Sequence, residues 1–182
     1  GLGCDPRNEQ AVRRLLARVA GFARAWGGAR RGPERAGGVA VTADMAAVEG
    51  AEVAERLIAE HGAFDRIVNN VGVTSGERFG DLSQPGFDRV LRTNLRAPLF
   101  LTQRLTAELI ERGRPGAVLF VGSLHSRINR GHPSYGATKA AIAALARELA
   151  AELAPHSIRV NVLSPGWVAT GAAADPPDTP PR

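Results

Sequence analysis

Apolar residues along this chain fall into two kinds of segment, which alternate from about residue 38 onward. Short runs rich in β-branched residues indicate strands, and longer segments with apolar residues three or four positions apart indicate amphipathic helices. The predicted strands cover residues 38–43, 65–69, 117–121 and 157–163. The predicted helices cover residues 46–60, 84–112 and 134–153, and Gly62 is placed to end the first of them.

This alternation predicts a fold class. Strands separated by helices indicate βαβ units, and right-handed crossovers between parallel strands then build a doubly wound α/β domain. The strands of such a sheet are buried on both faces, which agrees with their nearly continuous apolar runs. We therefore expect a single Rossmann-like core over residues 1–170, in which residues 1–37 match the pattern poorly.

The two ends of the chain depart from this alternation. Apolar spacing predicts a helix over residues 9–26, followed by a loop rich in glycine and arginine, and no strand is expected between residues 4 and 37. Residues 171–182 are rich in proline and lack apolar periodicity. This composition predicts a disordered tail.

Composition excludes several classes of function. Among the 182 residues, 44% are hydrophobic and 23% are charged, as in a globular domain. The net charge of +5 comes from dispersed arginines without interleaved aromatic residues, so we expect no nucleic-acid partner. No apolar run is long enough to span a bilayer, and we expect no membrane association. A single cysteine, Cys4, fits a reducing cytoplasm, and the four histidines lack the spacing of a metal site.

The chain has one tyrosine and one lysine, and they lie four residues apart as Tyr135 and Lys139. On a helix these two side chains share a face and can meet. A nearby ammonium favours the phenolate, so we predict that the pKa of Tyr135 lies below its usual value of about 10. Such a group is a candidate general acid or base. The alternative is an ordinary amphipathic helix with an aromatic residue and a cation near its start.

Polar residues and glycines follow the predicted strands where each one ends. In a parallel sheet these carboxyl ends share one edge, and ligands bind in the crevice there. The residues concerned are Asp44 after the first strand, Asn69, Asn70, Val71 and Gly72 after the second, Gly122 and Ser123 after the third, and Ser164, Pro165 and Gly166 after the fourth. Their repeated placement predicts a ligand site along this edge.

With these residues in place, the chain resembles the short-chain dehydrogenase/reductase family. The matching segments are NNVG (69–72), FDRVLRTNL with Asn94, VGS ending at Ser123, YGATK (135–139) and SPGWVAT (164–170). The resemblance covers residues 38–170 and implies reversible carbonyl–alcohol interconversion with a nicotinamide cofactor, of the ketoreductase or 3-oxoacyl reductase kind. It also implies a small-molecule carbonyl or alcohol substrate, and a homo-oligomer for the full-length parent.

The resemblance assigns a catalytic role to four residues. Tyr135 would exchange a proton with the substrate oxygen, and Lys139 would bind the nicotinamide ribose and lower the pKa of Tyr135. Ser123 would hydrogen-bond the substrate oxygen, and Asn94 would hold a water in a proton relay. Three alternatives remain: Ser123 could cap a strand end, Ser126 could take its role, and Asn94 could bond a backbone carbonyl.

The resemblance also implies a set of cofactor-binding residues. They are Gly1 and Gly3 in a glycine-rich turn, Asp44 at the adenine, Asn70 and Gly72 where the backbone approaches the cofactor, Pro165, Gly166, Val168 and Thr170 on the nicotinamide side, and Tyr135 with Lys139. Asp44 could instead cap the following helix. The arginine-rich region before residue 38 contains no acid at the expected position, which favours NADP over NAD. We interpret His125 and His132 as polar groups of the serine's loop rather than substrate ligands.

The sequence departs from the family pattern at both ends. The chain begins at Gly1-Leu2-Gly3, where the family's glycine-rich turn ends, so the family's first strand and first glycine are missing. After Thr170 it lacks the family's further helix and final strand. We therefore expect a core trimmed at both ends, and a non-catalytic remnant unable to bind cofactor is the alternative to an active oxidoreductase.

Overall fold

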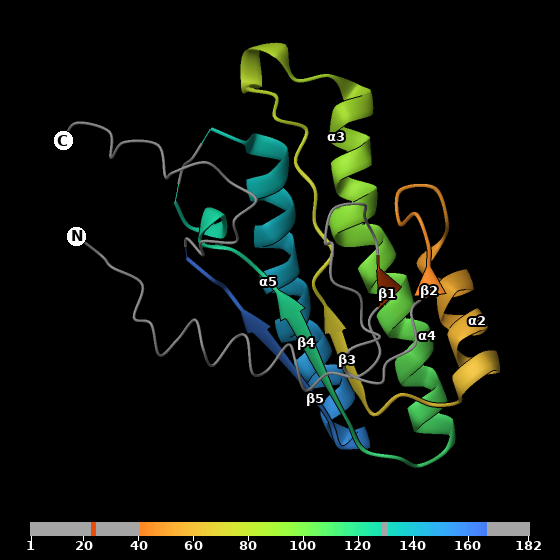
Figure 1. The fold of residues 1–182 in the computed structure, drawn as a ribbon. Helices are drawn as coiled ribbons and strands as arrows, with labels where there is room; N and C mark the ends of the chain where they lie inside the picture. The colour runs from red at the N-terminus through yellow and green to blue at the C-terminus, as the bar shows by residue number, and fades with distance from the viewer. Residues whose placement is uncertain (1–22, 25–40, 129–130, 167–182) are drawn as a thin grey trace.

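The computed structural model describes residues 23–24, 41–128 and 131–166 (Figure 1). The strands are β1 (Ala23–Arg24), β2 (Val41–Thr42), β3 (Arg66–Asn69), β4 (Gly116–Val121) and β5 (Ile158–Leu163). The α-helices are α2 (Gly50–His61), α3 (Gln84–Leu91), α4 (Ala97–Glu111) and α5 (Pro133–Leu153). Short 3-10 turns are η2 (Phe79–Asp81), η4 (Leu124–Ser126) and η5 (Ala154–His156), and η3 (Arg92–Arg96) is a π-helical turn. The predictions for Gly1, Gly3, Val168, Thr170 and the 171–182 tail lie outside the described residues.

The strands form parallel sheets, which confirms the predicted fold class. One sheet has the order β3-β4-β5, with Asn69 opposite Phe120 and Val121 opposite Leu163. A second, two-stranded sheet pairs β1 with β2, also in parallel. Among the described strands, β3 has a partner on one side only. The register brings the carboxyl ends of β3, β4 and β5 to the same edge.

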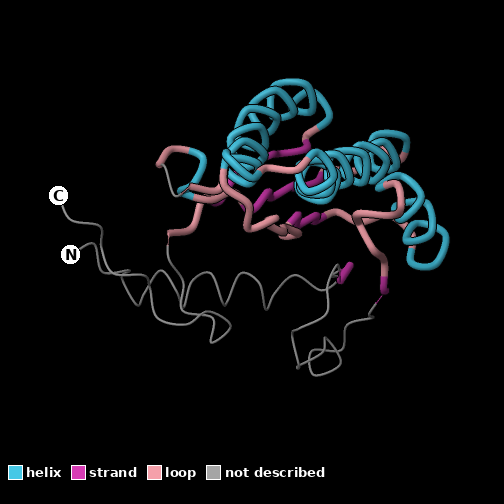
Figure 2. Tube along the Cα trace, turned by 90° about the horizontal axis from the view of Figure 1, so that it is seen from above, coloured by secondary structure: helices cyan, strands magenta, loops and turns pink. Residues whose placement is uncertain are grey.

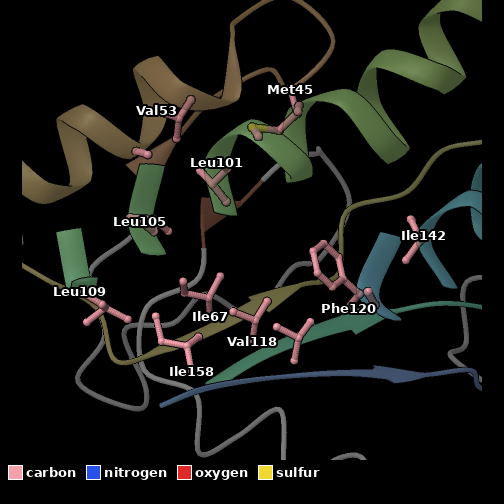
Figure 3. Close-up of a cluster of buried hydrophobic side chains, with 14 residues drawn as sticks. Met45, Val53, Ile67, Leu101, Leu105, Leu109, Val118, Phe120, Ile142 and Ile158 are labelled. Carbon is pink, nitrogen blue, oxygen red and sulfur yellow. The ribbon is translucent and has the colours of Figure 1, made fainter. Parts of the chain in front are cut away.

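The described helices form one layer above the three-stranded sheet. Figure 2 shows them on one side of β3, β4 and β5, and α2 packs on α4. Alternate strand residues face these helices, as period-two side chains require. The apolar core between the layers, seen in Figure 3, is built from the following buried residues: Met45, Val53, Ala54, Ile67, Ala97, Leu101, Leu105, Leu109, Val118, Phe120, Ile142, Ala146, Ile158 and Val160.

Most predicted elements are confirmed to within a few residues, and Gly62 ends α2 as expected. Its φ is +77°, and its N–H donates to the carbonyl of Ile58 at 2.8 Å. The predicted helix over residues 46–60 begins later, at Gly50, because residues 45–48 form a turn. A Cβ at Gly50 would overlap the carbonyl oxygen of Ala97, so the first residue of α2 must be small to lie against α4.

One prediction is wrong. Ala23–Arg24 is a strand, although no strand was expected between residues 4 and 37 and the predicted helix extended to Trp26. The pairing with β2 decides this conformation, and pairing with a distant strand is not visible in local apolar spacing. The predicted helix over residues 84–112 is confirmed, and it contains the π-helical turn η3 between α3 and α4.

Candidate active site

The ends of β3, β4 and β5 bring three of the sequence-predicted segments together. A Cβ at Gly122 would lie 2.7 Å from the hydroxyl oxygen of Ser164 and 2.9 Å from a methyl carbon of Val162, so only glycine lets the two strand ends approach this closely. The N–H of Leu124 also donates to the carbonyl of Pro165 at 3.2 Å. The residues after β4 and β5 therefore form one surface at the edge of the sheet.

Ser123 and Tyr135 meet on this surface. Ser123 precedes η4, and its hydroxyl oxygen accepts from the N–H of His125 at 3.2 Å. The Ser123 hydroxyl lies within reach of the Tyr135 phenol and acts to lower its pKa. The hydroxyl of Ser126 donates its hydrogen to the carbonyl of Ser123 at 2.7 Å. This hydrogen is therefore not available to bind a substrate oxygen.

The pKa of Tyr135 does not follow the sequence prediction. Burial of the ring raises the pKa above the usual 10, and the hydrogen bond with Ser123 offsets this only partly. The expectation that Lys139 lowers the pKa is wrong in this structure. The reason is geometric: the ammonium lies 5.5 Å from the centroid of the Tyr135 ring, and it is not hydrogen-bonded to the phenol oxygen.

Lys139 is a buried amine at the centre of the site. It is 3% exposed, and its Nζ donates to the carbonyl of Val121, the last residue of β4, at 2.8 Å. Burial lowers the pKa of Lys139 to about 8. Because α5 places Lys139 one turn after Tyr135, the helix fixes both groups relative to the strand end, as the spacing predicted.

Asn94 lies in the π-helical turn and is fully buried. Its Nδ2 donates to the carbonyl of Val73 at 2.9 Å and to the hydroxyl of Thr138 at 3.1 Å, and its Oδ1 accepts from the N–H of Val73 at 2.8 Å. The amide thus ties the segment after β3 to α5. The bond to the Val73 carbonyl agrees with the alternative that Asn94 bonds a backbone carbonyl, and this carbonyl belongs to the segment after β3 rather than to the helix of Asn94. The water relay stays a prediction.

Gly72 leaves open space in front of these groups. A Cβ there would lie 3.4 Å from Nζ of Lys139 and 3.9 Å from Oδ1 of Asn94, and Gly72 itself is exposed. Asn70 is also exposed, whereas Asn69 is buried and donates from Nδ2 to the hydroxyl of Thr102 at 2.8 Å. The residues present therefore fit a ligand that lies along residues 70–72 and reaches the amine.

Asp44 has the contacts of a turn cap. Its Oδ1 accepts from the N–H of Ala46 at 3.0 Å, and its carbonyl accepts from Ala47 at 3.0 Å and Val48 at 2.9 Å. These bonds organise the turn before α2, and the carboxylate remains exposed. A contact with the adenine of a cofactor stays a prediction for this residue. Pro165 and Gly166, described as the last residues after β5, likewise keep their cofactor role as a prediction.

Sequence reasoning missed Thr138, and it named His125 only as a polar group of the serine's loop. Thr138 is 1% exposed and links Asn94 to the carbonyl of Tyr135, to which it donates at 2.9 Å. Its position three residues after Tyr135 on the same helix was an available signal. The ring of His125 lies edge-on to the Tyr135 ring, with centroids 5.2 Å apart, and no local pattern announced this contact.

The described residues contain neither a candidate metal site nor a candidate membrane-spanning helix. No three of their histidine, cysteine, aspartate and glutamate side chains are grouped so as to hold a metal ion. In the same part of the chain, every helix is too short or too polar to cross a membrane.

Comparison with known proteins agrees with this geometry. Residues 24–181 match the family described as enoyl-(acyl carrier protein) reductase. The chain is similar to 2-dehydro-3-deoxy-D-gluconate 5-dehydrogenase of Dickeya dadantii, with 34% identity over 138 residues, 72% of this chain and 53% of that protein. It is also similar to carbonyl reductase (NADPH) 2 of Sus scrofa, with 38% identity over 120 residues, 65% of this chain and 49% of that protein.

Solved structures give the same result. A putative short-chain alcohol dehydrogenase from Sinorhizobium meliloti superimposes with a TM-score of 0.70 and 31% identity, covering 78% of this chain and 57% of that one. The chain spans about half the length of the curated relatives it matches. The family match, the parallel α/β fold and the Ser123, Tyr135 and Lys139 geometry together lead to one conclusion: the chain belongs to the short-chain dehydrogenase/reductase family.

Proposed function

We propose that this chain is a nicotinamide-dependent oxidoreductase that interconverts a carbonyl and an alcohol, of the ketoreductase or 3-oxoacyl reductase kind. The observation that carries the proposal is the convergence of three groups at the strand ends. The Ser123 hydroxyl lies within reach of the Tyr135 phenol and acts to lower its pKa, and the ammonium of buried Lys139 lies 5.5 Å from the centroid of the Tyr135 ring. Two hydroxyl groups that converge in this way are suited to bind one substrate oxygen.

Tyr135 is the proposed proton donor and acceptor. Because burial raises its pKa, the phenol is protonated at neutral pH and can donate to a carbonyl oxygen that gains negative charge. In the oxidative direction the same oxygen receives the alcohol proton. Ser123 orients the substrate oxygen, because its hydroxyl lies within reach of the same space as the Tyr135 phenol.

Lys139 is proposed to bind the ribose of the cofactor and to supply positive charge beside Tyr135. Its Nζ uses one hydrogen on Val121 and retains two more donors. Gly72 and Asn70 line the open space before it, and we propose that Asp44, Pro165, Gly166, Val168 and Thr170 complete the cofactor site with Gly1 and Gly3. A bound nicotinamide supplies or accepts the hydride. NADP is proposed over NAD, supported by the arginine-rich segment and by the NADPH in the name of the Sus scrofa relative.

The proposal assigns further roles. Asn94 holds the 72–74 segment and α5 in place, and we propose that it also supports the proton relay to Lys139. The substrate is a small carbonyl or alcohol, as the names of both relatives suggest. The full-length protein is proposed to be a cytoplasmic homo-oligomer.

The test is a fluorescence titration of the 182-residue chain with NADPH and with NADH, comparing wild type with Lys139→Ala. We expect saturable binding, tighter for NADPH, and its loss in the variant. A chain that is folded by circular dichroism and binds neither nucleotide would contradict the proposal and leave the non-catalytic remnant.

A second pair of variants separates the two candidate serines. Ser123→Ala should lower kcat about 100-fold, because it removes a donor to the substrate oxygen. Ser126→Ala should leave kcat nearly unchanged, because its hydroxyl is bonded to the Ser123 carbonyl. A large loss in the Ser126 variant alone would assign the role to that residue.

A further inference from the structure

A cavity of about 470 Å³ lies beside the candidate reacting group. Its walls include Arg78, Phe79, His125, Ile128, His132 and Pro133. Gly136, the residue after Tyr135, forms part of the wall, and the wall residue His125 packs its ring against the ring of Tyr135. The cavity therefore opens next to the residue that would exchange a proton with substrate.

The walls of this cavity are basic. Arg78, His125 and His132 line it, and none of the lining residues that the structure describes is an aspartate or a glutamate. Neither of the two acids nearest to Arg78 in the chain pairs with its guanidinium: Glu77 accepts at Oε1 from the hydroxyl of Ser83 at 2.6 Å and has no partner in the described part of the chain at its buried Oε2, and Asp81 accepts from the backbone N–H of Arg78 at 2.7 Å. A fixed positive charge thus borders the cavity.

The backbone is shaped to admit the guanidinium of Arg78. A Cβ at Gly131 would overlap Nη1 of Arg78, so the guanidinium lies directly against the glycine. Gly131 also has a φ of +73°, a conformation that other residues rarely adopt. Within the described ranges, none of the ion pairs involves Arg78, so its charge is available to a ligand.

His132 contributes a polar atom that a ligand can satisfy. Its Nδ1 is buried and has no hydrogen-bond partner among the described residues. It precedes the first residue of α5, yet its side chain makes no capping bond to the helix. A buried polar atom without a partner is costly, so a ligand oxygen placed here gains a bond that the protein alone does not make.

The rim of the cavity is apolar. Phe79 is 87% exposed and Ile128 is 42% exposed, and both line the cavity. Large apolar side chains exposed beside a basic wall suit a ligand with a short carbon chain and an anionic end. A neutral sugar or a simple ketone would leave the arginine without a partner.

We propose that this cavity binds the carboxylate of the substrate, and that Arg78 and His132 make the enzyme selective for small oxo acids and hydroxy acids over neutral carbonyls and alcohols. This assignment rests on the proposed function for the placement of the reacting carbon at Tyr135. Arg78 and His132 are specificity residues, and the chemistry remains with Tyr135 and Ser123.

A binding experiment tests the assignment without requiring turnover. Isothermal titration of the 182-residue chain with D-gluconate and with D-glucitol compares two six-carbon polyols that differ in charge. We expect gluconate to bind at least about tenfold more tightly, and Arg78→Gln and His132→Gln each to remove most of this preference. Arg78→Lys should retain part of it. Arg147→Gln is the matched control, since Arg147 is exposed on α5 and should not affect binding.

Equal affinity for the two compounds, no binding of either, or a preference that persists in Arg78→Gln would overturn the assignment. Circular dichroism of each variant confirms that it is folded. Because the readout is binding, a selective Arg78-dependent site in a chain that fails to bind NADPH would support the inference and refute the proposed function.

A kinetic experiment addresses selectivity directly. Acetoacetate and its ethyl ester present the same ketone with and without a charge, and NADPH oxidation measures their reduction. Arg78→Gln should raise the KM for acetoacetate about tenfold with little change in kcat, and should leave the ester unaffected. Reduction of both compounds with no dependence on Arg78 would refute the cavity assignment and leave the proposed function intact.

Discussion

In two regions of this molecule, the surroundings shift the pKa values of ionisable side chains in opposite directions. Where α2 packs on α4, Arg104 pairs with Glu55 and Glu108, and Arg112 pairs with Glu108. The hydrogen bond from Arg112, together with that from Arg104, lowers the pKa of Glu108. The hydrogen bond to Glu55 raises the pKa of Arg104. In this α2–α4 charge network, the ion pairs shift the pKa of Glu108 and that of Arg104 toward their charged forms.

In the candidate active site, the pKa values shift toward the neutral forms. Lys139 is not paired with a carboxylate in the described part of the chain, and burial lowers its pKa to about 8. Burial raises the pKa of Tyr135. Both groups are moved toward their neutral forms. Ion pairing stabilises the charged form of a side chain and so serves the structure. Burial without a charged partner stabilises the neutral form, and such a group is suited to exchange protons.

The largest expected effect comes from Tyr135→Phe. Removing the hydroxyl eliminates the proton donor, and kcat should fall about 1000-fold while NADPH binding persists. The ring packing against His125 is retained, so thermal unfolding should change little. The measurement is NADPH oxidation with acetoacetate, alongside the melting temperature. Retention of more than a tenth of the wild-type kcat would show that proton transfer does not depend on this residue.

The second prediction concerns the pH dependence of stability. The pKa of Lys139 is about 8 in the folded chain and about 10.4 in the unfolded chain, so the unfolded state binds the extra proton between these values. The free energy of unfolding should therefore rise by about 3 kcal/mol between pH 7 and pH 11.5 relative to Lys139→Met. Urea unfolding of both chains across this range measures it. Parallel pH profiles for wild type and variant would contradict the burial of an unpaired amine.

Asn94→Ala should have the next largest effect. The substitution removes three hydrogen bonds that join Val73 and Thr138 through a fully buried amide. We expect the free energy of unfolding to fall by about 2 kcal/mol. Asn161→Ala, at an exposed position of β5, is the matched control and should change stability by less than about 0.5 kcal/mol. Similar losses in both variants would argue against a special role for the π-helical turn.

The smallest effect is expected for Glu108→Gln in the α2–α4 charge network. Neutralising the shared carboxylate weakens both arginine pairs, and the melting temperature at neutral pH should fall slightly. Because the pKa of Glu108 is lowered, this contribution is present above its ordinary pKa of 4.5 and is lost as pH falls through the lowered value. Melting curves at pH 7 and pH 3 check this, with Glu148→Gln as the exposed control. A difference that persists at pH 3 would point to packing instead.

The candidate site could be predicted from the sequence to a large extent because its residues are tied to strand ends and to one helix. Ser123 follows β4 directly, and Tyr135 and Lys139 are separated by one helical turn, so local periodicity already places them. The cavity could not be predicted in this way. Arg78 reaches it from the segment after β3, and His132 reaches it from the start of α5. Only the packing of these distant segments brings a guanidinium and an imidazole together.

The order of strands and helices, the parallel α/β class and the spacing of Tyr135 and Lys139 could be predicted from the sequence, because they depend on local periodicity. The strand at Ala23–Arg24, the π-helical turn around Asn94 and the direction of the Tyr135 pKa shift could not. Each of these depends on contacts between residues far apart in the chain. Strand pairing, buried amide bonds and desolvation arise only when the fold has formed, so no local pattern could fix them.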